Sequence, residues 1–203
     1  MSTSTPDSTL QCPAADKEND IPVTFLLEAH ASGKRRNDVQ VHMTRPWQLR
    51  EWELSSDEPP DHGGDDTAPQ PLVIFAASLA TCFMTQFRTF ARAGRVDIAS
   101  LTVSGRFEWV MRRGARPAQP YTAQPGSFHL DIDLVSEADL AAKQALVATA
   151  ARGCFVEAVL SVPVAHRIKH DGQWVDCPLD GTPGAHEVVL RDGVPARTSS
   201  RST

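Results

Sequence analysis

The sequence predicts an α+β fold with a mostly antiparallel sheet. Segments with strand character come in two blocks, at 22–55 and at 97–169. Helical segments at 72–93 and 136–151 lie between and within these blocks. Because strands and helices are grouped and do not alternate strictly, the pattern disfavours a doubly wound, parallel nucleotide-binding fold.

The first block is expected to begin with a hairpin. Residues 22–30 and 38–44 have the composition of short strands, and the segment 32–37 between them has the Ser, Gly and Asn of a turn. Residues 49–55 can add a third strand. The following segment, 57–71, is rich in Pro, Gly and Asp and has no periodicity, which predicts a loop.

A long helix is predicted over 72–93. The segment is too long for a strand, and Pro71 before it suits the first turn of a helix. As far as Ala80 the segment is apolar nearly all round, which predicts that the first half of the helix is buried.

The second block combines strands with a second helix. Alternating polarity predicts strands at 97–110 and 127–135, with a Pro-rich loop at 112–126 between them. The Ser-Glu-Ala-Asp run at 136–139 resembles a capping box, in which Asp replaces the usual Glu, and opens a helix through Ala151. Two shorter elements complete the block: a helical piece at 154–160 and a strand at 162–169.

These elements define one domain, residues 21–170, with two tails. Residues 1–20 hold too few apolar side chains to repay the entropy of ordering, which predicts a disordered tail. Residues 171–203 are polar and rich in Gly and Pro, and are expected to form an extension with one short strand at 187–190.

Composition and charge argue against several classes of partner. The formal net charge is -5 and the basic run at 34–36 is short, so no nucleic-acid partner is expected. No apolar stretch reaches the roughly 18 residues of a membrane helix, and the N-terminus lacks the pattern of a signal peptide. We therefore expect a cytoplasmic protein without a membrane partner, whose cysteines are free thiols or serve in redox chemistry.

Two of the four cysteines are candidates for chemistry. Cys82 and Cys154 lie in apolar segments, whereas Cys12 and Cys177 lie in polar ones and are expected to be exposed thiols. On the residues alone, Cys82 can be a small core residue or a reactive thiolate. A thiolate needs a nearby cation, because Cys82 lies too far into its helix for the N-terminal dipole to act on it. Three hydroxyl residues share its helix face: Ser78, Thr85 and Thr89.

No cofactor is expected. The sequence has no Gly-rich phosphate-binding motif, and His166 and His170 are accompanied by no third metal ligand.

The segment 71–83, PLVIFAASLATCF, resembles the central-helix motif of the OsmC/Ohr family of hydroperoxide reductases, which starts with proline, passes through an Ala-Ala pair and ends in Ala-x-Cys. The Asp-Glu-Pro run at 57–59 and Gly63-Gly64 are similar to a loop of many OsmC-like members. The segment 145–154 is similar to the helix that delivers the second cysteine of the family. The resemblance covers roughly residues 22–170.

The resemblance implies an intertwined homodimer in which each sheet wraps around long central helices. It implies that Cys82 attacks an organic hydroperoxide and that the resulting sulfenic acid condenses with Cys154 to form a disulfide. A dithiol reductant, such as a lipoylated protein, then reopens the disulfide. The family arginine, which favours the Cys82 thiolate and polarises the peroxide, is matched by Arg35, with Arg36 as a one-residue alternative.

One departure from the family pattern bears on activity. Peroxidase members have a glutamate directly after the helix-opening proline, where it orients the arginine, and here that position is Leu72. A shift of the pattern to Pro69 would place Gln70 there, which is not an acid either. Three acids can substitute, and the sequence selects none of them: Glu58, Asp66 and Glu157.

Three functions therefore remain open. Cys82 and Cys154 favour a thiol-dependent peroxidase acting on organic hydroperoxides. Leu72 favours a catalytically weak OsmC-like protein that binds a small apolar ligand between its helices. The third is a structural or interaction protein whose cysteines are core residues.

Overall fold

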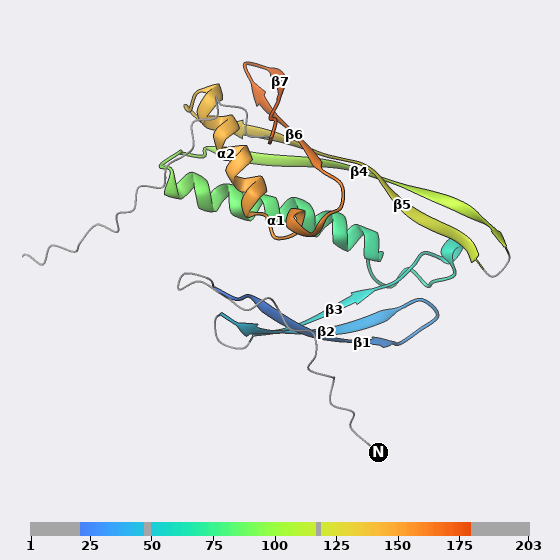
Figure 1. Ribbon diagram of the computed structural model, residues 1–203. Coiled ribbons are helices and arrows are strands. Elements are labelled where there is room, and N and C mark those ends of the chain that lie inside the picture. Colours follow the sequence, from blue (N-terminus) through green and yellow to red (C-terminus); the bar gives the residue numbers. More distant parts are fainter. Residues whose placement is uncertain (1–20, 47–49, 117–118, 180–203) are drawn as a thin grey trace, which may run out of the picture. The chain divides into compact units, whose positions relative to one another are not determined.

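The computed structural model describes residues 21–46, 50–116 and 119–179. The chain divides into two compact units, Met1–Ile74 and Phe75–Thr203. Each unit has its own sheet, and the long helices accompany the sheet of the second unit (Figure 1). The predicted α+β class is confirmed, and the dimer remains a prediction.

The sheet of the first unit has three antiparallel strands. They are β1 (Thr24–Ala31), β2 (Asn37–Arg45) and β3 (Arg50–Ser56), in that order across the sheet. The predicted hairpin and third strand are thus confirmed. A single short 3-10 helix, Pro60–His62, interrupts the loop that follows β3.

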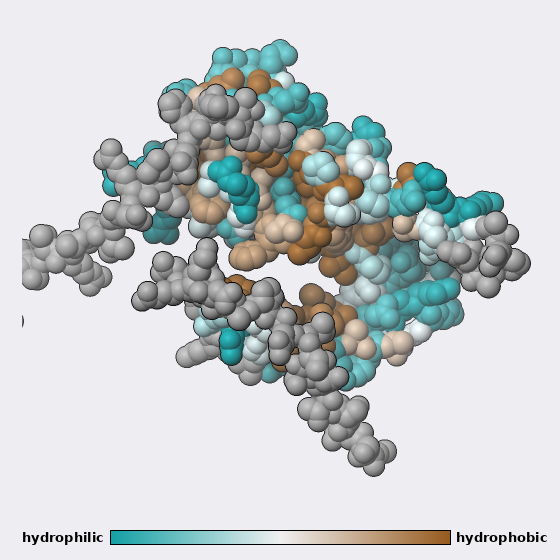
Figure 2. Space-filling model, viewed as in Figure 1, coloured by the Kyte–Doolittle hydropathy of each residue, from teal (hydrophilic) through white to brown (hydrophobic). Residues whose placement is uncertain are grey.

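One face of this sheet is apolar and open. The register places Leu27 opposite Val41, and Val41 opposite Trp52, so these side chains stand on the same face. Phe25 and Leu54 extend the face, and Leu27 is 67% exposed. Apolar residues gather visibly on this sheet in Figure 2. A contiguous apolar face of this kind is typical of a surface that another molecule covers.

The sheet of the second unit is mixed but mostly antiparallel, as predicted. Its order is β4 (Ser100–Arg116), β5 (Gln119–Val135), β6 (Val164–His170) and β7 (Gln173–Asp176), and only the β5–β6 pair is parallel. The sequence did not predict β7, and the strand that it predicted at 187–190 lies outside the described residues.

Two helices pack on the core of this unit. They are α1 (Pro71–Ala93) and α2 (Leu140–Gly153), and a 3-10 helix, Glu157–Val159, follows α2. Side chains four residues apart on α1 form a stripe that is buried against β5 and β6. The stripe consists of Leu79, Phe83, Phe87 and Ala91.

Two predictions about these helices need correction. The first half of α1 is not buried, since Leu72 and Val73 are both more than half exposed. A single sheet covers one side of a helix, so no described residue covers the other apolar side of α1. The N-cap of α2 is Asp139, whose carboxylate accepts a hydrogen bond from the Ala142 amide at 2.8 Å, and not a capping box opened by Ser136.

The Pro-rich loop predicted at 112–126 is also wrong. β4 continues to Arg116, and β5 begins at Gln119. Pro125 is tolerated because this part of β5 pairs with β4 alone, beside a register irregularity. The two strands therefore form a long hairpin arm that projects past α1 (Figure 1).

By length and composition alone, α1 could cross a membrane, and it is the one helix in the described part of the chain that meets this criterion. This differs from the sequence prediction that no stretch is long enough. The core helix of a soluble protein passes the same test, and the buried stripe of α1 packs on a sheet.

Candidate active site

The two cysteines predicted to react lie beside each other in the second unit. Cys82 lies on α1, and Cys154 is the residue that ends α2. The Cys82 side chain is close enough to the Cys154 thiol to raise its pKa. Cys154 is fully buried within the core, whereas Cys82 is half-buried at its edge. Cys82 is therefore the sulfur that a substrate can approach from solvent.

The surroundings of Cys154 keep it protonated. Burial is the largest influence and raises the pKa of Cys154 to about 12, with the nearby Cys82 thiol and Glu157 carboxylate acting in the same direction and the Glu157 amide opposing them. A thiol of this kind is a poor nucleophile at neutral pH until its proton is removed. The arrangement suits Cys154 to the second step of a two-thiol reaction and not to the first.

The structure corrects the interpretation of Cys177. The sequence predicts an exposed thiol, but Cys177 directly follows β7 and is buried in the same core. Burial raises its pKa to about 11. Its amide donates a hydrogen bond to the carbonyl oxygen of His166 at 2.8 Å, which anchors the end of β7. Cys12 lies outside the described residues.

The arginine turn between β1 and β2 distinguishes Arg35 from Arg36. The guanidinium of Arg36 is fully engaged: it donates to Ser55 Oγ at 2.8 Å and to Thr67 Oγ1 at 2.9 Å, and it pairs with Asp38 at 2.8 Å. Arg36 therefore ties the hairpin turn to the loop after β3. Among the described residues, no hydrogen bond or ion pair holds the exposed guanidinium of Arg35, which leaves its donors free for a ligand.

Arg35 lies over the loop at 57–71, whose sequence resembles a loop of OsmC-like proteins. Its Nε atom is 3.7 Å from the point where a Cβ on Gly63 would stand. Gly64 must be glycine, because a Cβ there would lie 1.8 Å from the carbonyl oxygen of Glu58. The close approach packs the two ends of this loop together under Arg35. The described parts of the two units are separate bodies, so the meeting of Arg35 with Cys82 stays a prediction.

A buried carboxylate organises the same loop. Asp57 accepts hydrogen bonds from the amides of Glu58 at 2.8 Å and of Thr67 at 3.0 Å, and from Thr67 Oγ1 at 2.8 Å. The Thr67 amide is the largest of the influences that lower the pKa of Asp57. The sequence does not indicate this role, since a loop rich in acids does not reveal which of them is buried.

Replacing Asp57 with asparagine is expected to destabilise the first unit. The charge-assisted hydrogen bonds weaken, and the melting temperature should fall by about 5 °C near neutral pH. Because the native pKa of Asp57 is lowered, its contribution is complete above the usual pKa of an aspartate and is lost as the pH falls through the native value. Thermal unfolding of wild type and variant across acidic pH should therefore converge, and a constant difference would contradict this account.

The structure places the three acids that could replace the missing glutamate. Glu58 accepts a hydrogen bond from Gln70 Nε2 at 3.0 Å and lies on the loop beneath Arg35. Asp66 is exposed. Glu157 belongs to the second unit, where its carboxylate is 3.3 Å from His166 Nε2. Glu58 and Asp66 both lie on the loop beside Arg35, and Glu58 is the preferred candidate because it is partly buried and hydrogen-bonded.

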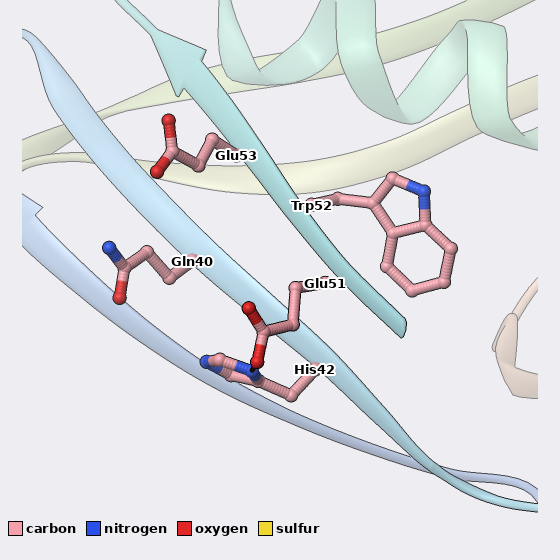
Figure 3. A pocket seen from close by; sticks show the side chains of 5 residues that line it. All are labelled: Gln40, His42, Glu51, Trp52 and Glu53. Atoms are coloured by element: carbon pink, nitrogen blue, oxygen red, sulfur yellow. Dashed lines mark ion pairs between the residues drawn. The ribbon is translucent and has the colours of Figure 1, made fainter. Parts of the chain in front are cut away.

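A hollow of about 250 Å³ lies on the three-stranded sheet. It is lined by Gln40, His42, Glu51, Trp52 and Glu53. Figure 3 shows His42 and Glu51 directed toward each other, 3.3 Å apart, while Trp52 points away to the other side. The hollow contains no cysteine, so we assign it no part in the thiol chemistry. No group of three or more metal-ligating side chains occurs in the described ranges.

The chain is similar to known proteins in both sequence and structure. Residues 63–169 match the family model described as OsmC-like protein. An OsmC-like hydroperoxide resistance protein from Jannaschia sp. CCS1 is 35% identical; the match covers 76% of this chain and 97% of that chain, with a TM-score of 0.43.

A more distant solved structure shares the fold, and another is similar at a lower score. An OsmC-like protein of unknown function from Vibrio cholerae has a TM-score of 0.51 at 14% identity, over 73% of this chain and 99% of that chain. An organic hydroperoxide resistance protein OsmC from Legionella pneumophila has a TM-score of 0.48 at 20% identity, over 71% and 94%. A comparison with curated proteins found no match.

Proposed function

Because the chain belongs to the OsmC-like family, we propose that it reduces organic hydroperoxides with Cys82 as the attacking thiol and Cys154 as its disulfide partner. The observation that supports the proposal most directly is the proximity of the two cysteines, which come from α1 and from the end of α2 and belong to the same core. The 35% identical relative is described as a hydroperoxide resistance protein, which supports the same class of substrate.

In the proposed cycle, the Cys82 thiolate attacks the outer oxygen of the hydroperoxide. The O–O bond breaks, an alcohol leaves after taking up a proton, and Cys82 becomes a sulfenic acid. The Cys154 sulfur then attacks Cys82: an S–S bond forms, the S–O bond breaks, and the hydroxide leaves as water. An external dithiol, such as that of a lipoylated protein, reduces the disulfide back to two thiols.

Arg35 is the proposed cation of the site. A guanidinium near a cysteine favours the thiolate, and its forked donors can polarise a peroxide oxygen. The engagement of Arg36 with Ser55, Thr67 and Asp38 argues for Arg35 over its neighbour.

The experiment that tests this function is treatment of the reduced protein with one equivalent of cumene hydroperoxide. We expect a disulfide between the peptides that contain Cys82 and Cys154, detected by mass spectrometry, and its disappearance after addition of a dithiol. A stable sulfenic acid on Cys82 beside a free Cys154 thiol would remove Cys154 from the mechanism.

A second function is favoured by one observation. Leu72 is 55% exposed at the start of α1, where an apolar side chain suits an apolar ligand better than it suits peroxide chemistry. If Cys82 stays reduced under the same treatment, a catalytically weak ligand-binding protein becomes the better description.

We also propose that the protein is a homodimer. The apolar face of β1–β3 and the open side of α1 at Leu72 and Val73 both need cover that the described residues of their own units do not give. A second copy of the chain can supply it, because closed symmetric dimers are the commonest soluble oligomers.

Light scattering at micromolar concentration should give twice the chain mass of 22.1 kDa. A monomer mass would contradict the dimer. The sheet offers a matched pair of variants: Leu27→Glu charges the apolar face and should weaken the dimer, whereas Leu26→Glu charges the opposite face and should not. The two leucines are similarly exposed, at 67% and 59%.

A further inference from the structure

A buried acid–imidazole pair lies next to the cysteine pair. Glu157 begins the 3-10 helix just after Cys154, and His166 lies on β6. His166 Nε2 is 3.3 Å from Glu157 Oε1, and the two side chains are 0% and 9% exposed. The His166 ring also packs on Phe83, the neighbour of Cys82, with ring centroids 5.1 Å apart. Burying two titratable groups is unfavourable unless they are paired, so the pair is a structural feature that calls for a role.

One nitrogen atom of this pair has no hydrogen-bond partner in the described chain and can accept a proton. His166 Nδ1 is buried and has no hydrogen-bond partner among the described residues. When Nε2 donates its hydrogen to Glu157, Nδ1 keeps an unshared electron pair. The pair can therefore accept one proton, on the carboxylate or on the ring, without breaking any other hydrogen bond in this part of the chain.

Glu157 acts on the sulfur that has to lose a proton. The backbone amide of Glu157 donates a hydrogen bond to Cys154, and the charge of its carboxylate acts on the same thiol. The other titratable side chain that acts on this thiol is Cys82 of α1. Among the described residues, no lysine or arginine forms an ion pair with Glu157. On the β7 side, the backbone amide of Cys177 donates a hydrogen bond to the backbone carbonyl of His166.

We propose that the Glu157–His166 pair takes up the proton of Cys154 while the disulfide forms, an inference that rests on the proposed function. The S–H bond of Cys154 breaks and its proton passes to the pair, while the sulfur electron pair forms the bond to Cys82. The hydroxide displaced from Cys82 takes a proton from solvent and leaves as water. The pair then returns its own proton to solvent, so that the step consumes no net protons.

Charge conservation favours this route. A Cys154 thiolate beside an ionised Glu157 would place two negative charges in a buried cluster, which is strongly disfavoured. Transfer of the proton to the pair keeps the charge of the cluster constant while the thiolate forms. The same carboxylate that opposes ionisation of Cys154 thus becomes its proton acceptor.

The pair also has a route to solvent. Glu157 lines a hollow of about 320 Å³ together with the charged Arg152 and the apolar Leu160. Cys154 itself is closed off from solvent. A proton taken from Cys154 can therefore leave through Glu157 and the hollow, and it does not have to pass the substrate side of Cys82.

The test separates the two chemical steps in single-turnover reactions with cumene hydroperoxide. Sulfenic acid on Cys82 is trapped with dimedone, and disulfide formation is followed by acid quench and mass spectrometry. In Glu157→Gln the first step should stay within about twofold of wild type, whereas disulfide formation should slow by about tenfold or more near neutral pH. The deficit should shrink as the pH rises, because hydroxide can replace the lost acceptor.

Three further variants distinguish proton transfer from structural support. His166→Gln should reproduce the slow second step, and Glu157→Asp should recover part of the rate because it keeps a carboxylate. Glu137→Gln, at an exposed acid, should leave both steps unchanged. If Glu157→Gln does not fold, His166→Gln and Glu157→Asp decide the question by the same pH dependence.

The failure of this inference is distinct from failure of the proposed function. If wild type forms the disulfide and the variants form it at the same rate, or with a deficit that does not change with pH, the pair is structural and the peroxidase proposal stands. If wild type forms no sulfenic acid on Cys82, both are wrong.

Discussion

Replacing Cys82 with serine is expected to abolish peroxide turnover. The hydroxyl of serine ionises far less readily than a thiol, and it cannot pass through a sulfenic acid or a disulfide. The rate with cumene hydroperoxide and a dithiol should fall by about a thousandfold or more, which corresponds to roughly 4 kcal/mol of activation free energy. The fall should be complete to the level of the uncatalysed reaction, because no other described cysteine has the exposure of Cys82.

Variants of the other two described cysteines show which step of the cycle each thiol serves. Cys154→Ser should still consume one equivalent of hydroperoxide and then stop, with Cys82 held as a sulfenic acid that dimedone can trap. Cys177→Ala should keep turnover within about twofold of wild type, and it should lower stability modestly by leaving a small cavity in the core.

Substantial turnover by Cys82→Ser would move the chemistry to another thiol. In that case Cys154 or Cys177 would have to react first, although burial raises the pKa of both, to about 12 and about 11. Loss of turnover in Cys177→Ala with an intact fold would give Cys177 a chemical role that its contacts do not indicate.

The strand and helix pattern was predictable because each element has a local signal. The stripe on α1 follows from apolar residues at helical spacing, and the alternation of β5 at 127–135 follows from its polarity. The sequence does not predict the hairpin arm at 112–126, because proline is tolerated in a strand only at the edge of a sheet. Whether β5 is an edge strand there depends on how far β6 pairs with it, which is a contact between distant segments. Burial of Cys177 likewise depends on β7 folding back beside β6.

The candidate site could be predicted only in part. Cys82 and Cys154 were found through motifs, and the structure brings the two together. The roles of Asp57 and of the Glu157–His166 pair arise from contacts between segments distant in sequence, so no local pattern indicates them. Arg35 is distinguished from Arg36 by the hydrogen bonds that Arg36 makes, and the sequence alone does not predict these bonds.

The acid that would orient Arg35 in the working site is its last open component, and Glu58 is the candidate we favour, although no ion pair joins the two in the described chain. Its carboxylate is held by Gln70 at 3.0 Å, on the loop whose Gly63 lies against Arg35 Nε. The backbone bond from Gly64 to Pro59, at 3.0 Å, closes the loop between these points. A carboxylate here can hold the fork of Arg35 in one orientation, as the glutamate missing at Leu72 does in the family pattern.

Glu58→Gln is therefore expected to slow the formation of Cys82 sulfenic acid by about ten- to a hundredfold. This is the effect of losing a charge-assisted hydrogen bond that contributes roughly 1.5–3 kcal/mol. Asp66→Asn is the matched control on the same loop, where a left-handed backbone tolerates asparagine, and it should leave the rate unchanged. The rate is measured by stopped flow with cumene hydroperoxide. A normal rate in Glu58→Gln would remove Glu58 from the site.

Leu72→Glu completes the test, because it restores an acid at the family position. In the Glu58→Gln background it should recover most of the lost rate, whereas in wild type it should add little if Glu58 already orients Arg35. It should also lower the preference for cumene hydroperoxide over hydrogen peroxide, since the exposed leucine is replaced by a charge that disfavours apolar substrates. If Leu72→Glu instead speeds the wild-type reaction by about tenfold or more, Arg35 is not oriented by Glu58, and the protein is a slow peroxidase for want of that glutamate.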